Sequence, residues 1–492
     1  MRWLKAIRHV LTGLVLIGLT IYFGRAFDAL RQPDLRPWHE LKLEAEYRLA
    51  EDGPLASFDD YLEIEDRVFE ELESELIEKL SPDNLPTFSR FDSAGPMFPG
   101  RLTRNWNRSF ELRPKVVVGG VVLIHGLTDS PYSMRSLARV FEQQGYRVVA
   151  PRMPGHGTTP GGLQHVDWED WMAVVVAAVR HTRQQIGPEH PLMLGGYSNG
   201  GALTVKYVLD SIDDEALETP SRVFLWSPAI AVTRFAALAN LHKALSWVSY
   251  FERFAWEGIQ PEFDPFKYNS FAKHAGWQSH RISKAIGSQL DRLTEQAKLE
   301  GLPDIYTFQS IVDATVLTNA VVRGLHDRLP PGHGELIVFG VNRVAKLEEF
   351  ISPPNDPVMW ALRDRLDLPF ALTHVTNRDP NSLEVVARHR TESEPFDAGT
   401  PLGLSWPPQV YSLSHVALPI PPDDPFYGRR EHVVSEQALA LGDLRPRGEK
   451  GILRVPVAQL MRLRFNPFFP YIERRLVELL AISRERPGPR DD

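Results

Sequence analysis

From about residue 115, short apolar runs alternate with longer amphipathic segments. The apolar runs are 115–126, 146–151 and 191–195, and helix-like segments lie between them at 130–145 and 167–187. Short runs rich in Val, Ile and Leu are typical of strands buried on both faces. Strands that alternate with helices form a parallel sheet with helices packed on both sides. The sequence therefore predicts an α/β fold with a mostly parallel central sheet.

A serine flanked by glycines stands where one of these strands passes into a helix. Residues 196–200 are "GYSNG", a GxSxG pattern that follows the run "PLMLG" and precedes the helix-like "ALTVKYVLD". In this context the pattern predicts a nucleophile elbow, in which the serine has a strained backbone and the glycines avoid collisions. Such a turn presents Ser198 Oγ beside a helix N-terminus, which favours developing negative charge. Ser198 is the predicted nucleophile.

A serine nucleophile needs a general base and an acid that orients the base. Asp313 follows the strand-like "IYTFQSIVD", and His415 follows "PQVYSLS", which we predict to be the last core strand. In the chain order Ser, Asp, His, both residues would lie at the sheet edge that carries Ser198. A helix cap is the alternative role for Asp313. His374, inside a strand-like run, is the alternative base.

Hydrolysis at such a serine also needs two backbone N–H groups that stabilise an oxyanion. We predict that Asn199, the residue after the nucleophile, supplies one of them. Leu127, in the loop after "VVLIHG", is the candidate for the other. His156 in "PGHG" is expected to hold its turn through hydrogen bonds to the backbone, with contact to the substrate as the alternative.

Five ordered motifs together resemble the α/β-hydrolase superfamily, in the serine esterase and lipase branch similar to monoacylglycerol lipases, lysophospholipases and bacterial carboxylesterases. They are "LIHGLTDSPYSM", "PRMPGHGTTPGGL", "GYSNGG", "QSIVDATV" and "SLSHVALP". The resemblance covers roughly 115–232 and 303–418. It implies an α/β-hydrolase fold with a helical cap, a triad of Ser198, Asp313 and His415, and an oxyanion hole formed by Leu127 and Asn199.

The resemblance also implies a serine hydrolase that cleaves carboxylic esters through an acyl-enzyme intermediate. We expect a lipid-like ester of the lysophospholipid or monoacylglycerol type, because the aromatic stretch 247–256 and the N-terminal segment would suit an amphiphile. The alternatives on the same fold are an acyltransferase and a serine aminopeptidase, in which the acidic stretch 260–265 would hold the substrate amine. A binding module without catalysis is a further alternative.

The composition narrows the class of partner. The formal net charge is −8, so nothing indicates binding to nucleic acid. The absence of cysteine excludes disulfides, thiolate metal sites and a cysteine nucleophile. The sequence has no HExxH motif and no GxGxxG motif, so neither a metal nor a cofactor is predicted.

The N-terminus departs from this soluble pattern. Arg2, Lys5 and Arg8 precede an uncharged run of about 16 residues that ends at Arg25, with no small-residue cleavage site after it. We predict an uncleaved membrane anchor over 1–25, slightly shorter than the ~20 residues that comfortably span a bilayer, with a cleaved signal peptide as the alternative. The charge pattern would place the catalytic domain outside the cytoplasm, in the periplasm of a bacterium.

Changes in residue composition and hydrophobic pattern divide the rest of the chain into parts. The predicted parts are a charged helical region at 26–90, a hydrolase core at 91–231, 301–334 and 405–492, a helical cap at 232–300, and an insertion with extra strands at 335–404. Residues 57–80 predict an amphipathic helix, and 87–91 and 105–112 are expected to form short strands. Two similar strand-like pieces in the insertion are expected to form a hairpin-like addition.

Overall fold

The computed structural model describes residues 2–485, apart from 31–32, 82, 84, 231–248, 346–356, 366, 392–393, 433–438 and 445–452. Its helices are α1 (Arg2–Leu30), α2 (Pro37–Glu40), α3 (Leu49–Asp52), α4 (Phe58–Glu75), α5 (Arg135–Gln143), α6 (Trp168–Ile186), α7 (Asn199–Asp213), α8 (Lys273–Glu295), α9 (Thr318–Gly324), α10 (Pro357–Asp364), α11 (Val457–Leu460) and α12 (Phe469–Glu485). Its strands are β1 (Phe110–Leu112), β2 (Gly119–Ile124), β3 (Tyr146–Ala150), β4 (Leu192–Tyr197), β5 (Arg222–Trp226), β6 (Trp256–Gly258), β7 (Phe271–Ala272), β8 (Asp304–Ser310), β9 (Gly334–Phe339), β10 (Ala371–Asn377), β11 (Glu384–Arg390) and β12 (Thr400–Ser405).

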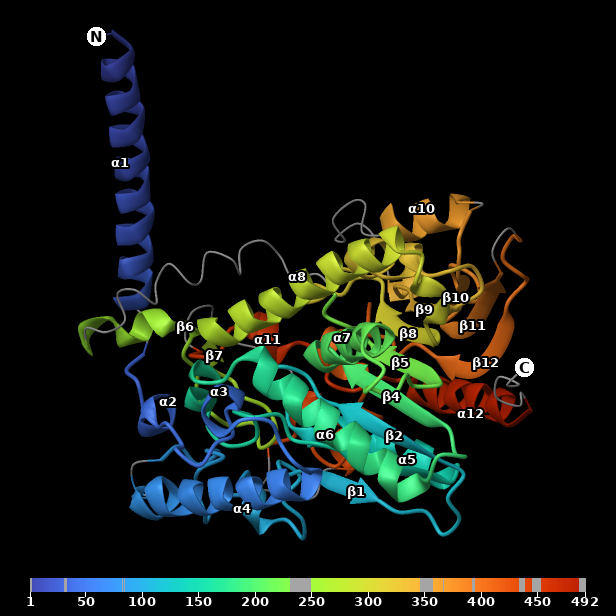
Figure 1. Cartoon of the computed structure of the whole chain (residues 1–492), viewed down its shortest axis with the longest axis horizontal. Coiled ribbons are helices and arrows are strands. Elements are labelled where there is room, and N and C mark those ends of the chain that lie inside the picture. Colours follow the sequence, from blue (N-terminus) through green and yellow to red (C-terminus); the bar gives the residue numbers. More distant parts are fainter. Residues whose placement is uncertain are drawn as a thin grey trace.

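Ten of the described strands form one sheet in the order β1-β3-β2-β4-β5-β8-β9-β10-β11-β12. The pairs from β3 through to β10 are parallel, and only the outer pairs β1·β3, β10·β11 and β11·β12 are antiparallel. The predicted α/β class with a mostly parallel central sheet is therefore confirmed (Figure 1).

Both faces of this sheet are buried, as the continuous apolar runs predict. In β2, Val122 and Ile124 belong to the core shared with α6, α7 and α8, whereas Val121 and Leu123 belong to the core shared with α5 and α12. Successive residues of a strand point to opposite faces, so one strand contributes to two cores. The strand can be apolar throughout because neither face contacts water.

The insertion differs from the predicted hairpin. Its two similar pieces form β9 and β10, which pair in parallel, with Leu372 opposite Leu336. Parallel neighbours need a crossover rather than a tight turn, and α10 lies in the connection between them. Strands β11 and β12 then extend the sheet in antiparallel fashion. The insertion thus continues the central sheet.

Two strands predicted from the sequence, at 87–91 and 408–414, are absent, and the strand predicted at 105–112 is shorter than expected. The stretch 87–91 forms turns, and 105–112 contributes only the short β1. The stretch 408–414, predicted as the last core strand, runs as a coil across the carboxyl ends of β8 and β9. There Ser310 Oγ donates to Leu413 O at 2.8 Å, and Asn342 N donates to Tyr411 O at 2.7 Å.

The predicted cap lies only partly within the described residues. Residues 232–248, which include most of its first helix-like stretch, are outside them. The second helix-like stretch forms α8, which crosses above α7 (Figure 1). Strands β6 and β7 precede α8 and form a separate two-stranded sheet.

The charged N-terminal region packs on the core through α4, the predicted amphipathic helix, whose first turn is capped by Ser57.

A buried ion-pair cluster joins this region to the loop after β3. The Arg152 guanidinium lies 2.8 Å from Glu46 Oε1 and 3.3 Å from Glu65 Oε2, and all three side chains are buried. Burial raises the pKa of Glu65, and the charge of Arg152 opposes this rise. The cluster holds two acids against one cation.

Replacing Arg152 with methionine is expected to lower the free energy of unfolding by about 3–5 kcal/mol, because two buried carboxylates lose their counter-charge. Urea denaturation followed by circular dichroism measures this change. The matched control is Arg139→Met on exposed α5 surface, expected to stay within about 0.5 kcal/mol of the parent chain. Equal stability of the two variants would contradict this role for the cluster.

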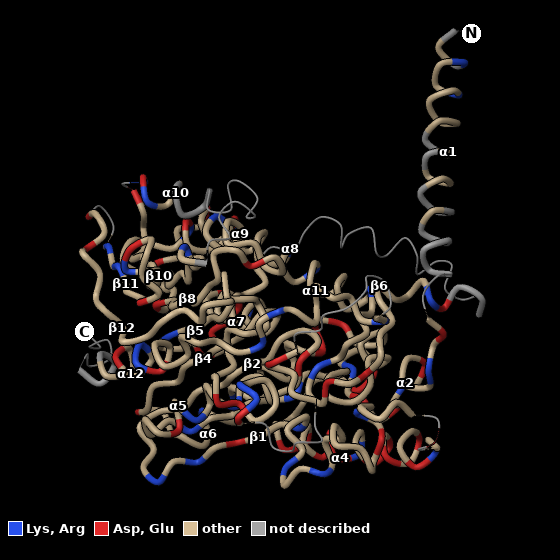
Figure 2. Tube along the Cα trace, turned by 180° about the vertical axis from the view of Figure 1, so that it is seen from behind, with Lys and Arg blue, Asp and Glu red and all other residues tan. Residues whose placement is uncertain are grey.

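Helix α1 covers the predicted anchor and projects from the body of the molecule (Figures 1 and 2). Several of its apolar side chains are exposed, among them Val10, Leu11, Val15 and Leu16. Among the described residues, no helix has the length and apolar character needed to cross a membrane. The predicted membrane-spanning anchor is therefore not supported.

Candidate active site

Strand β4 turns into α7 at Ser198, whose backbone has φ 55° and ψ −118°. A positive φ is uncommon for a residue other than glycine and is strained. The conformation is held on both sides, since Ser198 N donates to Trp226 O at 2.9 Å and Ser198 O accepts from Ala229 N at 2.9 Å. The sequence-predicted elbow is present as a local structure.

The glycines of the elbow are required by contacts with other backbone atoms. A Cβ on Gly196 would lie 2.2 Å from Gly200 O, and a Cβ on Gly200 would lie 2.1 Å from Ile124 O. Both distances are far below van der Waals contact and involve backbone, so neither neighbour can move aside cheaply. The strand, the turn and the helix are packed this closely only because side chains are absent at both positions.

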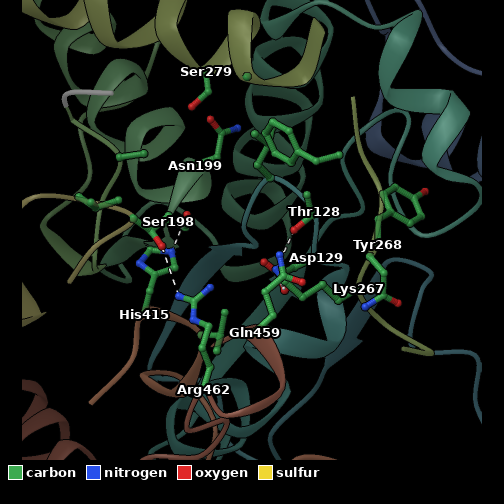
Figure 3. Close-up of a pocket in the computed structure, with 18 of the residues that line it drawn as sticks. Thr128, Asp129, Ser198, Asn199, Lys267, Tyr268, Ser279, His415, Gln459 and Arg462 are labelled. Atoms are coloured by element: carbon green, nitrogen blue, oxygen red, sulfur yellow. Dashed lines mark hydrogen bonds and ion pairs between the residues drawn. The ribbon is translucent and has the colours of Figure 1, made fainter. Parts of the chain in front are cut away.

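The structure brings Ser198, Asp313 and His415 together from three distant parts of the chain. His415 Nε2 lies 3.0 Å from Ser198 Oγ, and His415 Nδ1 lies 2.7 Å from Asp313 Oδ2. All three side chains are buried at the carboxyl edge of the sheet. Figure 3 shows the His415 ring against Ser198. The distances fit a base within reach of a nucleophile and an acid that orients the base.

Asp313 is held as an ionised carboxylate. Burial would raise its pKa, but the charge and hydrogen bond of His415 and the backbone N–H groups of Val316 and Thr315 outweigh burial and hold the pKa below its ordinary value. A carboxylate in this position favours the tautomer with the proton of His415 on Nδ1, in which Nε2 is able to accept a proton from Ser198. Asp313 is not the cap of α9, whose preceding residue is Leu317.

His374, the alternative base, lies elsewhere. It belongs to β10 and lines a different cavity with residues of the insertion. His415 instead begins a short 3-10 helix, His415–Ala417, and its carbonyl accepts a hydrogen bond from Tyr197 Oη at 3.4 Å. The histidine reaches the serine through a loop that crosses the edge of the sheet.

Leu127 and Asn199 both line the cavity that contains Ser198. Among the described residues, neither backbone N–H donates a hydrogen bond to an acceptor of the chain. Asn199 is the first residue of α7, where helical N–H groups have no partner within the helix. Two free donors beside the serine are what an oxyanion hole requires.

Comparisons with known proteins show similarity to hydrolases. Residues 116–282 match a family described as serine aminopeptidase, S33. A thermostable monoacylglycerol lipase of Bacillus sp. (strain H-257) is 26% identical over 227 residues, covering 46% of this chain and 78% of that protein. A carboxylesterase of Bacillus subtilis (strain 168) is 33% identical over 97 residues, covering 19% of this chain and 39% of that protein. The chain has the α/β-hydrolase fold.

Solved structures include a monoacylglycerol lipase of Paleococcus ferrophilus, 18% identical, which matches 47% of this chain and 89% of its own with a TM-score of 0.36. The α/β-hydrolase assignment rests on the family match, the strand order and the elbow. It does not depend on this low structural score.

The cavity of this α/β-hydrolase has a volume of about 380 Å³. Ser198 and His415 lie in its wall with apolar side chains of the core and cap, including Ala229, Phe271 and Val316. The 265–270 stretch of the cap closes one side. Lys267 Nζ donates to Thr128 Oγ1 at 2.7 Å, and Tyr268 N donates to Thr128 O at 2.8 Å. These contacts fix the loop that carries Leu127.

Sequence reasoning did not identify Lys267, Arg462 or Arg464, which also line the cavity. No local motif marks these residues. The two arginines follow α11 in the C-terminal part of the chain, and only the folded chain brings them to the cavity that contains Ser198. Figure 3 shows Arg462 beside His415.

His156 is bonded to backbone, as expected, and one of its partners is the oxyanion loop. Its Nε2 lies 2.5 Å from Leu127 O, and its Nδ1 lies 2.9 Å from Pro154 O. Burial lowers the pKa of His156 to about 4, so the ring is neutral at pH 7 and donates a single hydrogen bond. We assign that bond to the shorter contact, with Leu127. His156 is thus a positioning residue for the predicted oxyanion donor.

Replacing His156 with alanine is expected to lower kcat about tenfold with little change in KM, because the Leu127 N–H loses its alignment without being removed. Steady-state kinetics on a soluble ester measure kcat and KM separately. His156→Gln should restore part of kcat. The matched control is His326→Ala, a buried histidine bonded to Thr307 Oγ1 away from the site. Equal losses of kcat in both alanine variants would contradict the positioning role.

Proposed function

We propose that this protein is a serine hydrolase that cleaves lipid-like carboxylic esters of the lysophospholipid or monoacylglycerol type. The observation that carries the proposal is the continuous chain of contacts from Asp313 through His415 to Ser198, with 2.7 and 3.0 Å between heavy atoms. The chain is an ester hydrolase of the monoacylglycerol lipase and esterase type. The proposal adds the catalytic residues and the class of substrate.

The proposed mechanism follows from the positions of these groups. His415 Nε2 takes the proton of Ser198 as Oγ attacks the ester carbonyl, and the negative charge on the carbonyl oxygen is stabilised by the N–H groups of Leu127 and Asn199. Asp313 stabilises the imidazolium. The proton then passes to the leaving alcohol, and a water molecule, activated by the same histidine, releases the acyl group from the serine.

The aminopeptidase alternative shares the name of the matched family, but the acids it would use are already occupied. Glu262 accepts from the backbone N–H groups of Asn269 and Ser270 at 2.9 and 2.7 Å. Asp264 is fully buried and lies 3.0 Å from the Arg464 guanidinium. Asp129 lines the cavity but is paired with Lys267 at 3.0 Å. Without a free carboxylate in the described wall, a substrate ammonium group has no partner there.

The lipid-like substrate is supported by the apolar part of the cavity wall and by the similarity to a monoacylglycerol lipase and a carboxylesterase. Activity assays distinguish ester hydrolysis from the acyltransferase and binding-module alternatives. An acyltransferase would pass the acyl group to an added alcohol faster than to water, and a binding module would release no product.

A panel of p-nitrophenyl esters with acyl chains of two to sixteen carbons tests the proposal. We expect kcat/KM to rise from the shortest chains to a medium or long chain, because each methylene that enters an apolar cavity adds to binding. Equal kcat/KM across the panel would contradict the lipid-like substrate. No release of p-nitrophenol from any ester by the folded protein would contradict ester hydrolysis itself.

The extracytoplasmic location stays a prediction from the N-terminal charge pattern. Fractionation of cells that express the full chain, with protease added to intact spheroplasts, tests it. Digestion of the catalytic domain in intact spheroplasts is the expected result, and protection until lysis would contradict the prediction.

A further inference from the structure

The wall of the catalytic cavity carries more positive than negative charge. Lys267, Arg462 and Arg464 line it together with Ser198, and Asp129 is the acid among the described lining residues. Figure 3 shows Arg462 beside His415 and Lys267 beside Asp129. A cation beside a nucleophile can bind a ligand only where its charge is not already paired within the protein.

Two of the three cations already have carboxylate partners. Lys267 Nζ lies 3.0 Å from Asp129 Oδ1, and this pair also holds the oxyanion loop. Arg464 Nη1 lies 3.0 Å from the fully buried Asp264. These two ion pairs hold the cap and the C-terminal segment in place, and the charge of both cations is neutralised within the protein.

Arg462 is different, because no carboxylate among the described residues lies within ion-pair distance of it. Its one hydrogen bond there runs from Nη2 to Thr315 Oγ1 at 3.3 Å. Thr315 in turn donates its backbone N–H to Asp313 at 2.8 Å. The guanidinium is thus held by the loop that carries the triad acid, and its remaining donors have no acceptor among the described residues.

A cavity of about 380 Å³ has the size of a site for one small molecule, so an ester bound at Ser198 also lies near Arg462. A guanidinium presents several N–H donors in one plane and binds phosphate or carboxylate through two parallel hydrogen bonds. A neutral ester would offer this charge no such pair of bonds and would leave it to water, because Arg462 is partly exposed.

We propose that Arg462 binds a negatively charged group of the substrate, so that the preferred substrate is an acyl ester whose alcohol or acyl part carries a phosphate or a carboxylate. This inference rests on the proposed ester hydrolysis and narrows its substrate class. Among lysophospholipid and monoacylglycerol types, it selects the esters with a net negative headgroup over uncharged glycerol esters.

Paired substrates test the inference. For a charged alcohol part, 1-oleoyl-glycerol 3-phosphate is compared with 1-oleoyl-glycerol, both in the same mixed micelles of an uncharged detergent. For a charged acyl part, mono-p-nitrophenyl glutarate is compared with p-nitrophenyl valerate in solution. Each pair is assayed with the parent full-length chain, Arg462→Ala, Arg462→Lys and the control Arg454→Ala. Arg454 is an exposed arginine of the same segment outside the cavity wall.

In Arg462→Ala, we expect kcat/KM to fall about tenfold or more for the anionic member of at least one pair. The fall should come from a higher KM. The neutral member should change less than twofold, and Arg462→Lys should keep part of the preference. The pair that responds identifies where the charge sits. Equal losses on both members of each pair, or no loss beyond that of Arg454→Ala, would overturn the inference while leaving ester hydrolysis intact. If the parent chain cleaves none of the four esters, the proposed function falls and this inference with it.

Discussion

Replacing Ser198 with alanine is expected to lower kcat for any cleaved ester by about 10⁴-fold or more, because the acyl-enzyme can no longer form. Alanine keeps the Cβ of serine, so the strained turn at φ 55° and its packing are retained. The residual rate would come from the oxyanion donors and binding alone. Initial rates with p-nitrophenyl butyrate at high enzyme concentration measure the loss.

The matched control is Ser279→Ala. Ser279 lines the same cavity but has no histidine partner among the described residues. It should lose less than tenfold in kcat. A Ser198→Ala protein that keeps more than a tenth of the parent rate would mean that another group attacks the ester.

Replacing Asp313 with asparagine is expected to lower kcat by about 10³- to 10⁴-fold without unfolding the chain. Asparagine has the same shape, but its amide carries no charge to stabilise the imidazolium. An amide NH₂ that faces His415 Nδ1 also favours the tautomer with the proton on Nε2, which cannot accept from Ser198. The kcat of the purified variant, with its far-ultraviolet circular dichroism, tests this.

Asp304→Asn is the control for this variant. Asp304 begins the same strand, β8, and so lies at the opposite edge of the sheet from Asp313. It should keep kcat within about twofold. Equal activity of the two asparagine variants would contradict a role for Asp313 in orienting the base.

The sequence predicts the elbow at Ser198 well because the elbow is a local structure. Its strand, glycines and helix are adjacent in the chain, and the close contacts of Gly196 and Gly200 leave no other residue type. The parallel sheet is predicted for a related reason. Apolar runs such as β2 must be buried on both faces, and this pattern can be recognised in a single strand.

The structure places His415 at the predicted edge of the sheet, but not after a strand. It was expected after a last core strand at 408–414, and that segment is a coil. The coil nevertheless follows the carboxyl edge of the sheet, because Ser310 and Asn342 at the ends of neighbouring strands bind its backbone. The backbone of a strand-like sequence can form its hydrogen bonds either within a sheet or, as here, as a coil along the sheet edge. Tertiary context decides which of the two forms.

The parts that could not be predicted depend on contacts between distant segments. The parallel pairing of β9 and β10 is invisible in their similar sequences, because a hairpin and a crossover differ only in the connection. The cavity cations come from the cap and the C-terminal segment. Lys267 and Arg462, for example, are about 200 residues apart in the chain. Only folding brings them to Ser198.

The central claim is that Ser198 is a nucleophile activated by His415. Its most direct test is reaction of the full-length protein in detergent with a fluorophosphonate, followed by mass mapping of the modified peptide, with Ser198→Ala and His415→Ala beside it. We predict a single adduct on Ser198 of the parent chain, no adduct in Ser198→Ala, and labelling at least a hundredfold slower in His415→Ala. Equally fast labelling of Ser198 without His415, or no labelling of a folded parent chain, would contradict the account.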